Sequence, residues 1–466
     1  MIQQIRWGQR DSRELRSPFA RGKSTRPIRV IFHSSSFDRS DNDHRRAIEL
    51  LRELTKLTAV EAIDTEPGVL PYLEIERYGP SGSIPFFVKD GKATKIESGV
   101  RASEDLFEAF ASSTVNSRSE DFDREAAYQS FLVALTTAEL GFDILITLSS
   151  TILGNRENSW IRFVNVRSPI EAVKIIGLLL RTRGGYLFEP MPNYRLVMDR
   201  RSIHKELSRH KLPNVSAYIK ACAHAERFGA EGLTFLAQST LHRCIRALQA
   251  RDEIGALFYM PQSDDIRDST MYHFDYLALL LMGAFDAQAR VARRIYGINR
   301  PNERNTGFHR KEFLNALKES SANALHDLVH NQYFRDLMDL LTEIRNSIHS
   351  SIWPTIASEK DGEPQESFIN VPGCSQDKLW QAASRCGPAE DWGLIRLNDI
   401  SMVLLQPYTF AVNLVDTCFR QIDEIARLTD VARLLPLEFD MSQLREKPSY
   451  DERFIEFVRQ RVELLD

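Results

Sequence analysis

The chain has 466 residues, a formal net charge of −4, and ordinary proportions of apolar (43%) and charged (27%) residues. This length predicts about two to four domains, and the charge balance excludes a chain-wide basic field, so a nucleic-acid partner would need a local cationic patch. No stretch reaches the roughly 20 apolar residues of a membrane span, and the polar N-terminus is not a secretory signal. The five cysteines are widely spaced, without a C-x-x-C pair. We therefore expect a cytoplasmic protein with neither a disulfide framework nor a cysteine zinc site.

The N-terminal part of the sequence predicts a tail followed by a small α/β domain. Residues 1–25 are basic and polar, and we expect them to be a flexible tail. In residues 26–112, the β-rich run Ile28–Phe32 indicates a strand, and the apolar spacing after His44 indicates an amphipathic helix. Ile84–Glu97 reads as a hairpin around a polar turn, and a closing helix follows it.

The order of these elements resembles a thioredoxin-like fold. Ile84-Pro85 falls where that fold carries its cis-proline loop. The loop after the first strand has no cysteine, where that family carries its redox pair. The resemblance therefore implies a redox-inactive docking domain, and the alternative is an unrelated small α/β domain.

Residues 120–200 predict a second α/β unit. Asp143–Leu148 and Ile161–Val166 are candidate buried strands. Ser168 and Glu171 have the spacing of a capping box, which predicts that a helix begins there. No glycine-rich phosphate-binding motif is present, so nothing in the sequence marks a nucleotide site.

The rest of the chain is expected to be mainly helical. Residues 201–265 read as a helical connector, 266–435 as a helical domain, and 436–466 as a C-terminal helix or tail. Ser358–Pro388 is polar and rich in glycine, proline and serine, so it predicts a loop or an insertion. The fold class is α+β, with a helical C-terminal region. The helices that we expect are Val215–Arg227, Gly232–Ala250, Ser269–Ile298, Lys311–Glu319, Asn323–His330, Phe334–Ser350 and Pro407–Leu428.

Three polar residues near the end of one expected helix are the candidate catalytic residues, namely Arg345, Asn346 and His349. Positions four apart share a helix face, so Arg345 and His349 should stack at the edge of the core. The alternative is structural, because cations near a helix C-terminus are favoured by the helix dipole.

This segment resembles the HEPN superfamily, in which a helical bundle carries an arginine, often followed by asparagine, and then a histidine. A long helix before the motif and another after it fit the same order. Three residues separate Arg345 from His349, which is one fewer than the family's commonest spacing and turns the histidine by roughly 100° about the helix.

The resemblance implies a metal-independent endoribonuclease that works as a homodimer and needs no cofactor. Several family members are toxins or anti-phage defence effectors. Arg345 would stabilise the charge that develops on the phosphate, His349 would act as acid or base, and Asn346 would orient one of them. The alternative function is a catalytically inactive scaffold that binds proteins, with the N-terminal domain as a docking module.

Other patterns give weaker candidates. Arg304 to His309 matches the commonest family spacing with asparagine in place, but Gly307 indicates a loop there, so we rank it second. His326 and His330 lie one turn apart without a third metal ligand, which favours a solvated face over a zinc site.

Overall fold

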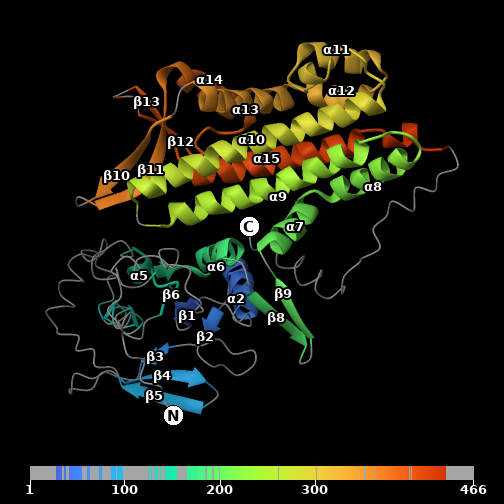
Figure 1. The fold of residues 1–466 in the computed structure, drawn as a ribbon. Helices are drawn as coiled ribbons and strands as arrows, with labels where there is room; N and C mark the ends of the chain where they lie inside the picture. The colour runs from blue at the N-terminus through green and yellow to red at the C-terminus, as the bar shows by residue number, and fades with distance from the viewer. Residues whose placement is uncertain are drawn as a thin grey trace. The chain divides into compact units, whose positions relative to one another are not determined.

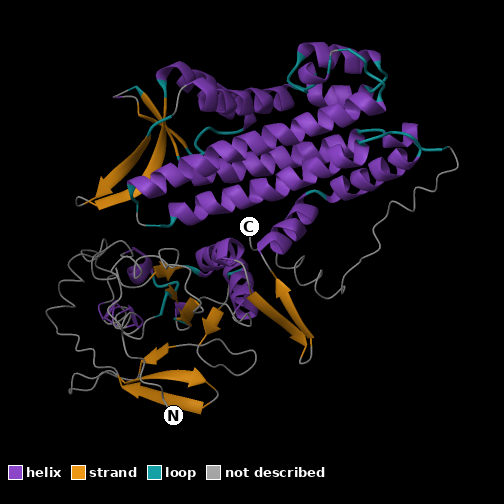
Figure 2. Ribbon diagram, in the orientation of Figure 1, coloured by secondary structure: helices purple, strands orange, loops and turns teal. Residues whose placement is uncertain are grey.

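The computed structural model describes residues 28–33, 36–37, 41–54, 60–62, 73–75, 85–90, 92–97, 124, 127–128, 131, 133–134, 137, 142–154, 165–183, 186–191, 194–198, 200–260, 262–300, 302–350, 353–360, 363–397, 399 and 401–436. These residues form two compact units, mainly Met1–Arg200 and mainly Arg201–Phe258 with Gln262–Arg459. The expected tail, the expected closing helix at Ser103–Phe110 and residues 437–466 lie outside the described residues. Within them the fold is α+β, with a helical C-terminal region (Figures 1 and 2).

The first unit contains a parallel sheet with the order β2-β1-β6-β7. Its strands are β1 (Ile28–Phe32), β2 (Val60–Ala62), β6 (Ile144–Ile146) and β7 (Asn165–Arg167). All three residues of β6 are buried, as is usual for a parallel sheet covered on both faces. Helices α2 (Asn42–Leu54) and α6 (Pro169–Arg183) pack against each other beside the sheet, and the short α5 (Ser150–Gly154) follows β6.

This sheet joins strands from both parts of the N-terminal half. β1 pairs in parallel with both β2 and β6, so strands from residues 26–112 and 120–200 belong to one sheet. The hairpin of β4 (Pro85–Asp90) and β5 (Lys92–Glu97) pairs with β3 (Leu73–Ile75) in another sheet. The resemblance to a thioredoxin-like fold stays a prediction.

The start of α6 confirms the predicted capping box. The backbone N–H of Ser168 donates to Glu171 Oε2 (3.0 Å), and the backbone N–H of Glu171 donates to Ser168 Oγ (3.3 Å). Each side chain satisfies one of the donors that the first helical turn leaves unpaired. A second hairpin, β8 (Tyr186–Met191) with β9 (Tyr194–Met198), follows α6.

The second unit is a helical bundle with a small sheet at one end (Figure 2). Its long helices α9 (Leu233–Phe258), α10 (Asp264–Ile295) and α15 (Pro407–Leu428) pack along one another, so α9 belongs to the bundle and is not a connector. The side-chain amide of Gln288 in α10 donates to the backbone oxygen of Ile422 in α15 (2.7 Å) inside this core. Shorter helices surround the long ones: α7 (Arg200–Lys211), α8 (Pro213–Arg227), α11 (Lys311–Glu319), α12 (Asn323–His330) and α13 (Gln332–Ser350).

The segment Ser358–Pro388 was expected to be a loop or an insertion, and the loop is wrong. It holds the second half of β10 (Thr355–Lys360), then β11 (Glu363–Val371) and α14 (Gly373–Cys386). With β12 (Leu394–Leu397) and β13 (Met402–Leu405), the two strands form an antiparallel sheet of order β10-β11-β13-β12. Polar residues on the exposed faces dominate the composition, while Phe368, Ile369, Val371 and Leu379 are buried.

Candidate functional site

Helix α13 presents Arg345 and Asn346 in different surroundings. Phe334, Leu341 and Ile344 are buried, which fixes the rotation of the helix. At this rotation the side chain of Arg345 is half-buried and that of Asn346 is exposed. His349 lies in the last turn of the helix. Its side chain is outside the part of the chain that the structure describes.

The charge of Arg345 acts on two residues that were not among the first candidates from the sequence, namely Asp286 in α10 and His309 in the loop before α11. A Cβ added to Gly307 would lie 2.8 Å from Cε1 of His309 and 3.4 Å from Oδ1 of Asp286. The two side chains therefore meet over the backbone of that glycine. The charge of Arg345 acts on the pKa of both Asp286 and His309. Three separate elements thus contribute one side chain each to a cluster, which we call the Asp286–His309–Arg345 cluster.

Aromatic packing holds the loop in this position. Phe308 is 2% exposed, and its ring meets that of Phe334 in α13 edge to face, with centroids 6.1 Å apart. Phe334 in turn packs edge to face on Phe285 of α10, at 5.7 Å. Phe285 and Phe308 precede Asp286 and His309 in the sequence. The buried phenylalanines therefore place the two polar neighbours at the surface above them.

Burial shifts the titration of both groups in the cluster. It raises the pKa of the Asp286 carboxyl, against the opposing effects of His309 and of nearby arginines. Burial lowers the pKa of His309, while Asp286 raises it and Arg310 and Arg345 lower it further. The imidazole of His309 is therefore largely neutral at pH 7, and its buried Nδ1 has no hydrogen-bond partner among the described residues. A neutral imidazole beside a guanidinium can accept a proton from a bound group.

A further arginine lies next to the cluster. A Cβ added to Gly283 would lie 2.8 Å from Nε of Arg243, so this α9 side chain crosses the surface of α10 one turn before Asp286. Arg243 also acts on the pKa of Asp286. The site therefore combines one partly buried carboxyl group, one neutral imidazole and two guanidinium groups. This combination suits an anionic ligand such as a phosphodiester.

The other sequence candidates are used differently. The rings of His326 and His330 stack with centroids 5.1 Å apart, and no group of three potential metal ligands occurs among the described residues. Two histidines of the first unit have polar partners: His44 pairs with Asp41 (2.9 Å) at the start of α2, and His33 bonds to Thr147 (3.0 Å).

The arginines after Asp286 are likewise occupied in part. Arg293 donates to the backbone oxygen of Asn299 (3.1 Å), and Arg294 donates to that of Glu231 (2.6 Å). Both therefore fix loops at the end of α10. Arg290, one turn after Asp286, instead acts on the pKa of that carboxyl.

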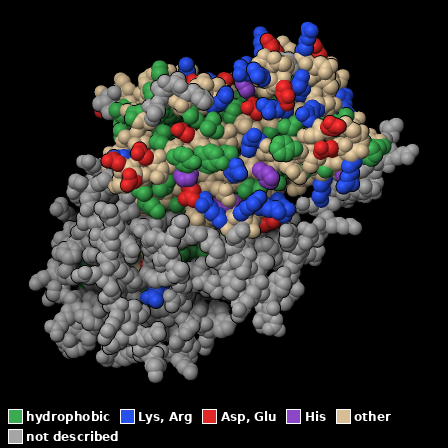
Figure 3. All heavy atoms as spheres, viewed as in Figure 1, with side chains coloured by type: hydrophobic (Ala, Val, Ile, Leu, Met, Phe, Trp, Pro, Cys, Tyr) green, Lys and Arg blue, Asp and Glu red, His purple; other side chains and the backbone are tan. Residues whose placement is uncertain are grey.

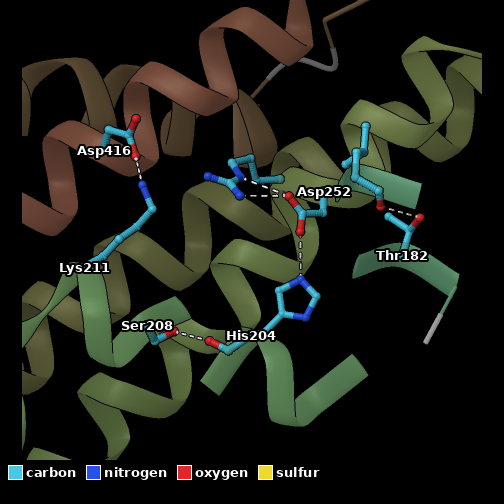
Figure 4. Close-up of polar contacts among 8 residues, drawn as sticks. Thr182, His204, Ser208, Lys211, Asp252 and Asp416 are labelled. Atoms are coloured by element: carbon cyan, nitrogen blue, oxygen red, sulfur yellow. Dashed lines mark hydrogen bonds and ion pairs between the residues drawn. The ribbon is translucent and has the colours of Figure 1, made fainter. Parts of the chain in front are cut away.

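A second polar group in the helical unit is structural. Nε2 of His204 lies 2.8 Å from Oδ2 of Asp252, and both side chains are completely buried. Arg251 donates to the other oxygen of Asp252 from Nε (3.1 Å) and Nη2 (2.9 Å). Figure 4 shows the imidazole of His204 directed at Asp252, within the helices and away from the Lys211–Asp416 ion pair. A ligand has no access to a group with no exposed surface, so this network ties α7 to α9.

Comparison with known proteins gave no match to a family model, a curated protein or a solved structure. Among the described helices, none is both long enough and apolar enough to cross a membrane.

Sequence reasoning missed the grouping of Asp286 and His309 with Arg345, although a signal for His309 was present. His309 ends the Arg304–His309 pattern, whose first residue is exposed in a 3-10 turn. The glycine that argued against a helix there is the residue that lets the imidazole approach α10 closely.

Proposed function

We propose that the helical unit is a metal-independent endoribonuclease of HEPN type, with Arg345 and His309 in its catalytic centre. The observation that supports this proposal is the Asp286–His309–Arg345 cluster, in which a partly exposed imidazole has a lowered pKa and is acted on by the charge of a half-buried guanidinium. His349 and Asn346, the other residues expected from the sequence, complete the proposed set from the same helix as Arg345.

The chemistry assigns a role to each group. His309 takes the proton of the ribose 2′-hydroxyl, whose oxygen attacks the adjacent phosphorus. The bond from phosphorus to the 5′-oxygen breaks, and His349 gives that oxygen its proton. Arg345 binds the phosphate oxygens, on which negative charge grows in the transition state. The products are a 2′,3′-cyclic phosphate and a free 5′-hydroxyl, and no metal ion takes part.

The test is cleavage of mixed cellular RNA by the purified full chain in the presence of EDTA. Two results together would support the proposal. Wild type should cleave RNA and leave 2′,3′-cyclic phosphate ends, and a His309→Ala variant with an unchanged circular dichroism spectrum should not cleave it. Metal-dependent cleavage, 5′-phosphate products, or equal activity of the variant would overturn it.

One observation favours a second candidate function, that of a catalytically inactive scaffold. Asp286 lies beside Arg345, and an ionised carboxylate there offsets the cation that a phosphate would need. A scaffold of this kind would leave RNA intact and bind a protein through the helical unit or the N-terminal unit. Pull-down with the full chain and the RNA assay above distinguish the two functions.

Replacing Asp286 by asparagine should shift the acid limb of the activity profile to lower pH. Asp286 raises the pKa of His309, so its removal lets burial and the two arginines lower that pKa further. The base form of His309 then persists to lower pH. The profile of rate against pH checks this, together with the NMR titration of His309. An acid limb that stays in place or rises would contradict the base role.

Replacing Gly307 by alanine should reduce cleavage by about 10²-fold, the order expected when a catalytic group moves by about 1 Å. The new Cβ would lie 2.8 Å from Cε1 of His309, so the ring has to shift. Gly373→Ala is a control for the general effect of removing a glycine, because nothing lies within 4 Å of a Cβ built there. Equal activity of the Gly307 variant and wild type would show that the placement of His309 is unimportant.

A further inference from the structure

One face of α10 leads from exposed aromatic residues to the catalytic cluster. Positions on this face recur every three or four residues and lie within about 80° of one another around the helix. We call this face the α10 stripe, and its residues are Tyr272, Tyr276, Leu279, Gly283, Asp286 and Arg290.

The first half of the stripe is aromatic and accessible. The side chain of Tyr272 is 67% exposed and that of Leu279 is 41% exposed. The rings of Tyr272 and Tyr276 stack with an interplanar angle of 17° and centroids 6.4 Å apart. Two nearly parallel, accessible rings of this kind are a surface on which nucleobases stack, irrespective of base identity. The partly buried carboxyl of Asp275 lies next to Tyr276 in the sequence, which makes this half unsuited to phosphates.

The second half of the stripe is cationic. Arg243 crosses the stripe at Gly283, and Arg345 acts on Asp286 one turn further along. On the face drawn in Figure 3, hydrophobic side chains gather toward the end of the unit with β10 and β11, and lysine and arginine side chains are more frequent toward α11 and α12. The stripe has the same polarity, because α10 runs from the sheet end toward α12 (Figure 1).

We infer that the α10 stripe binds single-stranded RNA, with bases stacked on Tyr272 and Tyr276 and a phosphodiester at Arg243 and Arg345. This inference rests on the proposed ribonuclease function and assigns its substrate class. Tyr276 and Asp286 are ten residues apart on one helix, a distance of about 15 Å along its axis, which a short run of nucleotides spans. A duplex keeps its base faces stacked on one another, so it cannot use the tyrosines in this way.

The charge of the stripe supports RNA as its occupant. A partner that offers only apolar groups would cover the tyrosines and leave the arginine half unused. A single RNA strand offers base faces and phosphates within one chain, in the order that the stripe presents them.

The test measures binding separately from cleavage. The probe is a fluorescein-labelled single-stranded oligonucleotide of mixed sequence with 2′-O-methyl groups, which lacks the nucleophile and cannot be cleaved. Tyr272→Ala with Tyr276→Ala should weaken its binding by about tenfold or more, since each stacked base contributes on this order. Tyr272→Trp keeps a stacking surface and should bind as wild type does. Phe228→Ala removes an exposed aromatic residue (57% exposed) that is not on the stripe, and should also leave binding unchanged.

The outcomes separate this inference from the proposed function. If the probe binds through the tyrosines but native RNA is never cleaved, the ribonuclease proposal fails and the binding site stands. If wild type cleaves RNA and the double alanine variant binds the probe as wild type does, the stripe is not the binding site. A duplex probe that binds as tightly as the single strand also overturns the inference. The inference is also overturned if the double alanine variant binds the single-stranded probe as wild type does but no longer forms a dimer in sedimentation. In that case a second copy of the chain occupies the stripe.

Discussion

Replacement of Arg345 by alanine is expected to abolish RNA cleavage, with a loss of at least about 10²–10³-fold in kcat. Losses of this size follow the removal of one fixed donor to the charge of a transition state. Arg345 is half-buried and its charge acts on Asp286 and His309, so its guanidinium is partly shielded from water. The measurement is single-turnover cleavage of a defined RNA in the presence of EDTA.

The matched control for this variant is Arg335→Ala. Arg335 lies on the same helix, carries the same charge, and is exposed. Its replacement removes one positive charge from α13 without touching the cluster, so cleavage should fall by no more than a few-fold. If the two variants lose activity equally, Arg345 contributes only to the general attraction of RNA, and the catalytic role is wrong.

Alanine variants of His309 and His349 in the same cleavage assay test the roles proposed for the two histidines. We expect His309→Ala to lose the acid limb of the pH profile, because His309 is the proposed base. His349→Ala should instead lose the basic limb of the pH profile, because His349 is the proposed acid. A substrate with a better leaving group than the 5′-oxygen should restore the rate of the His349 variant alone. If this substrate restores the rate of the His309 variant instead, the roles of base and acid are reversed between the two histidines.

The second large effect is on stability. Asp252→Ala is expected to lower the free energy of unfolding by about 3–5 kcal/mol, the usual cost of removing one partner from a buried charged pair. The carboxylate is completely buried and bonds to both His204 and Arg251. Its loss leaves a guanidinium in the core without that counter-charge. Guanidinium-induced unfolding of the full chain, followed by far-ultraviolet circular dichroism, measures the change.

The control is the ion pair between Asp377 and Arg396 on the surface. These side chains are 81% and 37% exposed, with Nη2 to Oδ1 at 3.0 Å. Asp377→Ala should therefore change the free energy of unfolding by less than about 1 kcal/mol. An Asp252 variant as stable as this control would show that the buried network contributes nothing to folding.

Local sequence patterns predicted the helices of the second unit closely. The expected helices at Lys311–Glu319, Asn323–His330 and Pro407–Leu428 are present with the same bounds. Each has an apolar stripe with helical period, and such a stripe forms a helix wherever it finds a core to cover. The capping box at Ser168 was equally predictable, because its hydrogen bonds join residues only three apart.

The partners of these elements were not predictable in the same way. The sequence of β1, Ile28–Phe32, does not indicate that it pairs with β6, which lies more than a hundred residues further along the chain. Backbone hydrogen bonds in a sheet are alike for every sequence, so they do not specify the partner strand. The loop expected at Ser358–Pro388 failed for a related reason. Its strands contain several polar residues, and they depend on pairing within the β10-β11-β13-β12 sheet.

For the candidate site, the sequence by itself determined the helix that carries Arg345, Asn346 and His349 and the half-buried setting of Arg345. Tertiary structure alone decided that Asp286 and His309 are the neighbours of Arg345. The physical reason is that the cluster depends on the packing of three phenylalanines from three elements and on a glycine whose missing side chain allows a close approach. The periodicity of a helix depends only on residues that are close in the sequence. The positions of Asp286, His309 and Arg345 relative to one another are fixed only when the core is packed.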